Sequence, residues 1–279
     1  MPSATQPLLI VGDRFAGFTV QDTVQTVTQL IDDLHQGVYS QGAEGVYSRS
    51  SEPIRIRAGQ GVTLEDYEAI WDEFVLRGLA GRLDFPYAEP ALAARGEAHK
   101  HCETNTLIAN LRRDDDTTFA ADLRLHNDNE ILLDHQTGEH VQGMVAIEAA
   151  RQMFLAVSER FFASHHPQRR YYYVIESMHT DFENFLFPLD ATIEYRITRA
   201  DTADPTRLAF TADVSILQAG RRSSLTAVAF TAFEAHVLQA KEHRRAEKAV
   251  AHQSREAVTA AATPVPAPAA APQPVLAAA

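Results

Sequence analysis

From residue 104 onward, β-branched and aromatic residues gather in six short segments, each bounded by turn residues. This pattern is typical of β-strands. A longer segment, 141–164, separates the second strand from the third and is apolar around nearly its whole helical circumference. Because such a helix must be buried, we expect a sheet wrapped around one long central helix, which is an α+β fold. The expected strands are 104–111, 119–125, 171–178, 191–198, 208–217 and 223–233.

The first 95 residues show a different order of elements. We expect a buried strand at 8–15, a helix at 23–35 closed by Gly37, a loop at 39–51 and a strand at 54–59. Thr63 is a good N-cap for a helix over 64–78. The apolar residues of that helix recur at helical spacing and are expected to form one buried face: Leu64, Ile70, Trp71, Phe74 and Val75. The mixture predicts an N-terminal α/β region, followed by a linker at 81–97.

The end of the chain changes composition twice. Residues 241–256 are polar and predict a helical extension, whereas 257–279 are mostly alanine and proline. A segment with almost no large side chains cannot bury enough surface to offset the entropy of ordering, so we expect a disordered C-terminal tail. We therefore divide the chain into an N-terminal region (1–95), a central domain (96–240) and an extension with its tail (241–279).

Charge and cysteine content limit which binding partners and which cellular compartment we expect. The formal net charge of -12 argues against nucleic acid, although a few local arginines can still bind a small anion. The single cysteine, Cys102, fits a reducing cytoplasm. Residues 1–15 lack the pattern of a signal peptide, and no run approaches the roughly 18 apolar residues of a membrane span. We expect a cytoplasmic protein without a membrane or nucleic-acid partner.

Three polar residues interrupt the apolar surface of the expected central helix. Glu148, Arg151 and Gln152 stand at positions i, i+3 and i+4 and therefore share one face. Burying a carboxylate and a guanidinium is costly unless the two are paired or take part in function. An ion pair that only neutralises itself would satisfy both residues. The residues just before the helix favour a functional site.

Two histidines and two glycines form the approach to this helix. His135, Gly138, His140 and Gly143 indicate a shaped turn that leads to unpaired backbone N–H groups at the positive end of the helix dipole. Gly143 would let a ligand approach this backbone closely, and the N–H groups could polarise a thioester carbonyl. Glu148 could act as a general base, because desolvation by apolar neighbours is expected to raise its pKa.

The segment 134–152 resembles two groups of hotdog proteins. The spacing H-x-x-G, glycine, E-x-x-x-Q is similar to that of β-hydroxyacyl carrier-protein dehydratases. A closer resemblance is to the A-factor biosynthesis hotdog family (AfsA-like), with the pattern D-H-x-x-x-H-V-P-G-M followed by E-A-x-R-Q. The corresponding residues are Asp134, His135, His140, Val141, Gly143, Met144, Glu148, Ala149, Arg151 and Gln152. Gln142 stands where the family usually has proline, and the chain has one such motif, whereas typical members carry two.

The resemblance implies a hotdog fold and an acyltransferase. The reaction would join a β-ketoacyl group, carried as an acyl carrier protein or CoA thioester, to a hydroxyl of dihydroxyacetone phosphate on the way to γ-butyrolactone signals. Glu148 would be the base, Arg151 would bind phosphate or the oxyanion, and His135 or His140 would orient the acyl carbonyl. The expected substrate-binding residues are Gly138, Gly143, Met144 and Gln152.

We expect neither a cofactor nor a metal ion, and the single motif suggests a homodimer that completes the site. His99, His101, His126 and Asp128 fit no metal-ligand spacing and are expected to be solvated strand ends together with Lys100. Two alternatives stay open at this point. The same site could dehydrate or hydrolyse an acyl thioester, or the domain could bind acyl groups without catalysis.

Overall fold

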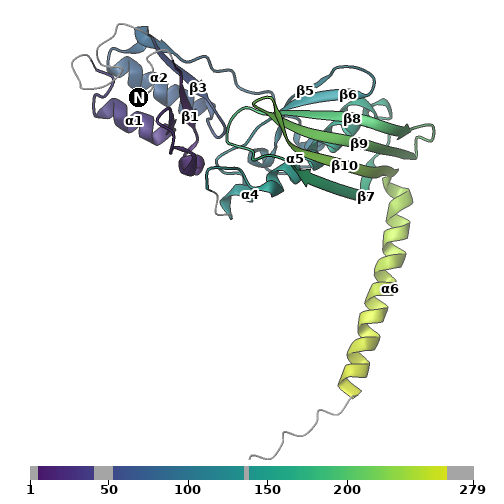
Figure 1. Cartoon of the computed structure of the whole chain (residues 1–279). Coiled ribbons are helices and arrows are strands. Elements are labelled where there is room, and N and C mark those ends of the chain that lie inside the picture. Colours follow the sequence, from purple (N-terminus) through teal and green to yellow (C-terminus); the bar gives the residue numbers. More distant parts are fainter. Residues whose placement is uncertain (1–5, 41–52, 135–137, 263–279) are drawn as a thin grey trace, which may run out of the picture.

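The computed structural model describes residues 6–40, 53–134 and 138–262, which form two sheets and the helices that pack on them (Figure 1). The predicted loop at 39–51 falls largely outside these residues, as do His135 and most of the predicted tail. Short helical turns join the larger elements: η1 (Asp13–Phe18), η2 (Ala80–Arg82), α3 (Arg95–Ala98), η3 (Glu103–Asn105), α4 (Glu130–Leu133) and η4 (Ala163–His165).

The N-terminal sheet is parallel and has the strand order β2-β1-β3-β4. Its strands are β1 (Leu8–Val11), β2 (Val24–Thr26), β3 (Ile54–Ala58) and β4 (Leu83–Asp84). Helices α1 (Val27–His35) and α2 (Leu64–Leu76) pack beside it and share its core, which includes Ile10, Leu30, Ile54 and Phe74. The expected N-terminal α/β region is therefore present.

The second sheet is antiparallel, with the strand order β5-β6-β8-β9-β10-β7. Its strands are β5 (Ile108–Arg113), β6 (Thr118–Leu123), β7 (Tyr171–Phe182), β8 (Thr192–Asp201), β9 (Arg207–Gln218) and β10 (Arg221–Glu234). It curves around helix α5 (Gly143–Phe161), as Figure 1 shows. The six strands and the one central helix confirm the predicted α+β hotdog fold.

The burial of α5 explains why the sheet forms around it. Eleven of its 19 residues are buried, among them Val145, Met153, Phe154 and Val157. Alternate residues of the strands face them; in β9 every second side chain from Leu208 to Ile216 is buried. Apolar area removed from water contributes about 25 cal/mol per Å², so this shared interior is the main source of stability for the domain.

Two local predictions were wrong, and a third element extends beyond its predicted bounds. Val24–Thr26 form β2 rather than the start of a helix, because they pair in parallel with β1. On α2, Ile70 and Phe74 are buried, whereas Leu64, Trp71 and Val75 are 37%, 40% and 48% exposed. Helix α6 (Ala235–Ala262) starts inside the predicted central domain, continues past residue 257 and projects away from the sheet (Figure 1). The remaining predicted tail lies outside the described residues.

Gln60, just after β3, joins the two sheets. Its side-chain Nε2 donates to the carbonyl oxygens of Leu123 and Leu189 at 2.9 and 3.1 Å, and its Oε1 accepts from the N–H of Leu125 at 2.7 Å. Its main-chain N–H donates to the carbonyl of Pro188 at 3.0 Å. Because Gln60 is only 5% exposed, these bonds fix the N-terminal sheet against the hotdog domain.

Candidate active site on the central helix

The start of α5 is held by neighbouring elements. The N–H of Val141 donates to the carbonyl of Leu186 at 2.7 Å, and the Gln142 side chain donates to the carbonyl of Ile131. Gln142 has an extended backbone and caps the helix without a side-chain cap bond, so Gly143 is the first helical residue. A Cβ at Gly143 would lie 2.9 Å from the ring of Phe182, so the close approach that this glycine permits is used by an aromatic ring at the end of β7.

Glu148 is the centre of a cluster of donors. Arg151 donates to its two carboxylate oxygens from Nε at 2.8 Å and from a terminal nitrogen at 3.0 Å. The Gln152 amide donates to Oε1 at 3.0 Å. Lys100, which precedes the helix by more than 40 residues, places its Nζ 2.6 Å from the same oxygen. The predicted grouping of Glu148, Arg151 and Gln152 on one face is thus present, and a second cation joins it.

This cluster overturns the expected pKa of Glu148. Burial does act to raise the pKa, as expected, but hydrogen bonds from Arg151, Lys100 and Gln152 stabilise the carboxylate more strongly and lower the pKa to about 2. Glu148 is therefore ionised at neutral pH, with its oxygens occupied. The prediction of a raised pKa was wrong because the apolar neighbours alone were considered.

Gln152 is a fully buried residue whose amide has three partners. Its Oε1 accepts from the N–H of Leu107 at 2.8 Å, and its Nε2 donates to the carbonyl of Asn105 at 2.9 Å as well as to Glu148. Its hydrogen-bonding groups therefore connect the helix to the segment just before β5 and hold Glu148. This geometry favours a positioning residue over the direct substrate contact that we expected.

The other predicted site residues lie on the approach to the helix. His140 is exposed, and its ring lies 4.7 Å from that of Phe185. Gly138 is exposed and lies against Gly17 of the N-terminal region. Met144 is 56% exposed and stands one helical turn before Glu148 on the same face. In the described part of the chain, no hydrogen bond or ion pair joins His140 to Glu148.

Apolar side chains surround the start of α5 on the protein surface. Phe182 and Phe185 are 57% and 69% exposed, and Met144, the second residue of the helix, is 56% exposed. Strand β7, which leads to these phenylalanines, stands at the edge of the sheet and exposes Tyr172 and Ile175. An apolar surface of this kind beside a charged cluster suits either an acyl chain or another protein.

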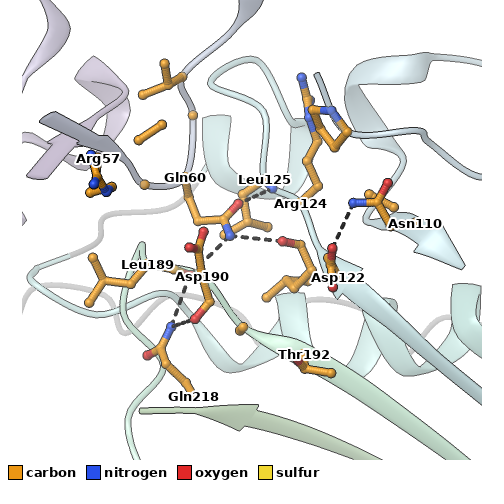
Figure 2. Close-up of a pocket in the computed structure, with 18 of the residues that line it drawn as sticks. Arg57, Gln60, Asn110, Asp122, Arg124, Leu125, Leu189, Asp190, Thr192 and Gln218 are labelled. Atoms are coloured by element: carbon orange, nitrogen blue, oxygen red, sulfur yellow. Dashed lines mark hydrogen bonds between the residues drawn. The ribbon is translucent and has the colours of Figure 1, made fainter. Parts of the chain in front are cut away.

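A large cleft in the described part of the chain lies elsewhere. It has a volume of about 940 Å³ and lies between the N-terminal sheet and the outer face of the hotdog sheet, where Arg57, Gln60, Asp122 and Arg124 line it (Figure 2). None of the residues 138–152 lines it. Glu148 and the polar cluster around it on α5 therefore lie outside this cleft.

Lys100 is the site residue that the sequence did not reveal. It stands in the segment that we expected to be solvated, and the structure instead gives its side chain only 21% exposure beside Glu148. His99 is likewise engaged, 3.0 Å from the Glu159 carboxylate. No local spacing connects residues 100 and 148, so only the packing of the two segments could have found this pair. The described residues contain no group of three side chains suited to a metal ion.

Comparison with known proteins gives one family match and a low similarity to solved structures. The model of the A-factor biosynthesis hotdog domain matches residues 84–234. The chain also resembles two solved mutant thioesterases at low similarity. The one from Pseudomonas aeruginosa has 15% identity and a TM-score of 0.35, covering 46% of this chain and 81% of the other. The one from Staphylococcus aureus has 9% identity and a TM-score of 0.34, covering 44% and 92%. No curated protein matches the chain.

The sheet around its central helix and the family match define the class of protein first: a hotdog-fold protein. The match over 84–234, more than half of the sequence, shows that the chain belongs to the A-factor biosynthesis hotdog family. In the part that the structure describes, no helix is long and apolar enough to cross a membrane.

Proposed function

We propose that the protein transfers a β-ketoacyl group from an acyl carrier protein or CoA thioester to a hydroxyl of a phosphorylated triose such as dihydroxyacetone phosphate. The product would lead to a γ-butyrolactone-type signal or secondary metabolite in the cytoplasm. The observation that carries this proposal is Glu148 held between Lys100 and Arg151, on the central helix of an A-factor biosynthesis hotdog domain. A carboxylate can accept the proton of a hydroxyl, and a guanidinium suits a phosphate.

The proposed reaction needs one base and one site for the developing negative charge. The acceptor oxygen attacks the thioester carbonyl carbon while its proton passes to Glu148. The tetrahedral intermediate then collapses, the C–S bond breaks, and the leaving thiolate takes the proton from Glu148. Backbone N–H groups at Gly143 and Met144 begin the helix and carry the positive end of its dipole, so they suit the oxyanion. His140, and His135 outside the described residues, are proposed to orient the acyl group.

A homodimer is part of the proposal. Residues 91–93 cover the outer edge of β5, where Ala93 N donates to Ile108 O at 2.8 Å and Asn110 N to Ala91 O at 2.7 Å. Strand β7 is the other edge of the sheet, and its 12 residues lack such a cover in the described chain. Pairing β7 with β7 of a second copy would give the open backbone N–H and C=O groups of both strands hydrogen-bond partners. It would also bury the exposed Phe182 near the start of α5 in each copy.

The decisive experiment measures thiol release and product mass. The purified protein is incubated with a β-ketoacyl thioester, with and without dihydroxyacetone phosphate. Thiol release that depends on the triose and yields a phosphorylated ester supports the proposal. Release without the triose would identify a thioesterase, and an enoyl product from a β-hydroxyacyl thioester would identify a dehydratase. Acyl binding without turnover on any of these substrates would identify a non-catalytic acyl-binding protein.

A further inference from the structure

Lys100 reaches Glu148 from a separate segment, which we call the strap (residues 95–105). Four contacts fasten the strap to α5. Arg160 binds both oxygens of Glu97 at 2.8 and 2.6 Å, and His99 lies 3.0 Å from Glu159. The Asn105 carbonyl accepts from Gln152 at 2.9 Å, and Lys100 itself contacts Glu148. Because contacts lie on both sides of Lys100, its position along the helix is fixed.

The backbone next to Lys100 adopts a conformation that needs such support. His99 has a φ of 52°, in the left-handed region that non-glycine residues rarely enter. Residues held there are under backbone strain, and they persist only where surrounding contacts impose the conformation. The Glu97–Arg160 and His99–Glu159 pairs supply those contacts. The strap therefore holds a strained backbone at His99, and this conformation directs the Lys100 side chain at the Glu148 carboxylate.

The charges of the cluster do not balance. Two cations, Lys100 and Arg151, surround the one carboxylate of Glu148, which leaves a net charge of about +1 in the neutral-pH cluster. The side chains of Glu148, Lys100 and Arg151 are 16%, 21% and 30% exposed, so the cluster is only partly covered and a ligand can reach the cations. At partial burial, opposite charges attract more strongly than they do in water, because the effective dielectric is lower. A dianion can compete with Glu148 for both cations.

We propose that Lys100 and Arg151 together form the binding site for the phosphate of the acceptor, and that phosphate binding draws both cations away from Glu148 and so frees it as the base. This inference rests on the proposed function and adds to it a second phosphate-binding residue and an order of events. The acceptor activates the base that will deprotonate its own hydroxyl.

The arrangement would also protect the thioester from water. The groups that face Glu148 are Lys100 from the strap and Arg151 and Gln152 from its own helix, and all three donate to it. In that state the strongly lowered pKa makes Glu148 a poor base, so it would not activate water. Only an acceptor that carries an anionic group would release it. A transfer enzyme thereby avoids acting as a thioesterase.

The first experiment measures the binding of inorganic phosphate at pH 7.5 by calorimetry. The wild type is compared with K100M, and K248M on the exposed helix α6 is the matched control. We expect K100M to weaken phosphate binding by at least about tenfold and K248M to leave it unchanged. Phosphate affinity of K100M equal to that of the wild type would overturn the proposal. K100R should restore part of the affinity, since it keeps the charge.

The second experiment follows the titration of the Glu148 carboxyl carbon by NMR, with E148Q used to assign the signal. Sulfate serves as the probe, because it keeps both negative charges to a far lower pH than phosphate does. Saturating sulfate, or the K100M substitution, should move the Glu148 titration to higher pH, whereas an unchanged midpoint with sulfate bound would overturn the proposal.

Neither the phosphate-binding readout nor the NMR readout needs turnover. If both succeed but no triose phosphate is acylated, the anion site stands and the proposed function fails. If K100M transfers acyl groups with a wild-type KM for dihydroxyacetone phosphate, the function stands and this inference fails.

Discussion

Among the single residues of the site, Glu148 links chemistry to folding stability. Its pKa is lowered from 4.5 to about 2, so the folded protein favours the ionised form more than the unfolded chain does. A shift of this size corresponds to about 3 kcal/mol of stability at neutral pH. The contribution is complete above the unfolded pKa and is lost as the pH falls from about 4.5 towards 2.

This linkage gives a prediction for E148Q. The difference in unfolding free energy between the wild type and E148Q should be largest above pH 4.5 and should shrink as the pH approaches 2. Denaturant unfolding at a series of pH values measures it. E139Q, at an exposed carboxylate in the same region, is the control. A wild-type advantage that stays constant down to pH 2.5 would show that the donors around Glu148 do not stabilise its charge.

Gln152 leads to a second prediction about a single residue. We expect Q152A to lower the unfolding free energy by about 2–4 kcal/mol, because it leaves the buried N–H of Leu107 unpaired and opens a cavity. Chemical denaturation measures the loss. A stable Q152A variant with impaired turnover would instead favour the direct substrate contact expected from the motif.

The site could be predicted from the sequence only where its residues are local. Glu148, Arg151 and Gln152 lie within one helical turn, so their spacing revealed a common face. Lys100 joins them from the strap, and no periodicity reports a contact between segments that far apart. The same omission explains the wrong expectation for the pKa of Glu148, since the missing cation is one of the groups that lower it.

Among the elements, strand β9 was predictable because it has 12 residues, and every second side chain from Leu208 is buried. Strand β2 was not, because Val24–Thr26 exist as a strand only through pairing with β1, and Thr26 then caps α1. On α2, the apolar spacing found the helix but overestimated its buried face. Trp71 and Val75 point away from the core that Ile70 and Phe74 fill.

The start of α5 gives a prediction at this scale. In G143A, the new Cβ would lie 2.9 Å from the ring of Phe182, which can move because it is 57% exposed. We expect a change of less than about 1 kcal/mol in stability, since alanine favours the helix, and a larger fall in turnover because the ring would shift at the helix start. G96A, where a Cβ meets nothing within 4 Å, is the matched control. Wild-type turnover in G143A would show that the contact between Phe182 and the helix start does not affect the reaction.

For the whole molecule, the open edge of β7 predicts the oligomeric state. We expect the wild type to be a dimer and I175K to be a folded monomer, because Ile175 is 43% exposed on the edge strand and a lysine there opposes strand pairing. Light scattering after size-exclusion chromatography measures the mass. V250K, at an exposed position on α6, should remain dimeric. A monomeric wild type with full activity would remove the second copy from the site.

The hydrogen bonds of Gln60 between the N-terminal sheet and the hotdog domain have a practical consequence for the study of the hotdog domain alone. A truncated protein that begins at residue 84, where the family match starts, would lose Gln60 and its hydrogen bonds. The N–H of Leu125 and the carbonyls of Leu123, Pro188 and Leu189 would then lose their partners, and a surface shaped to receive another sheet would face solvent. Such a fragment should express poorly or aggregate. The first 83 residues therefore cover a surface of the hotdog domain, and recombinant work should keep them.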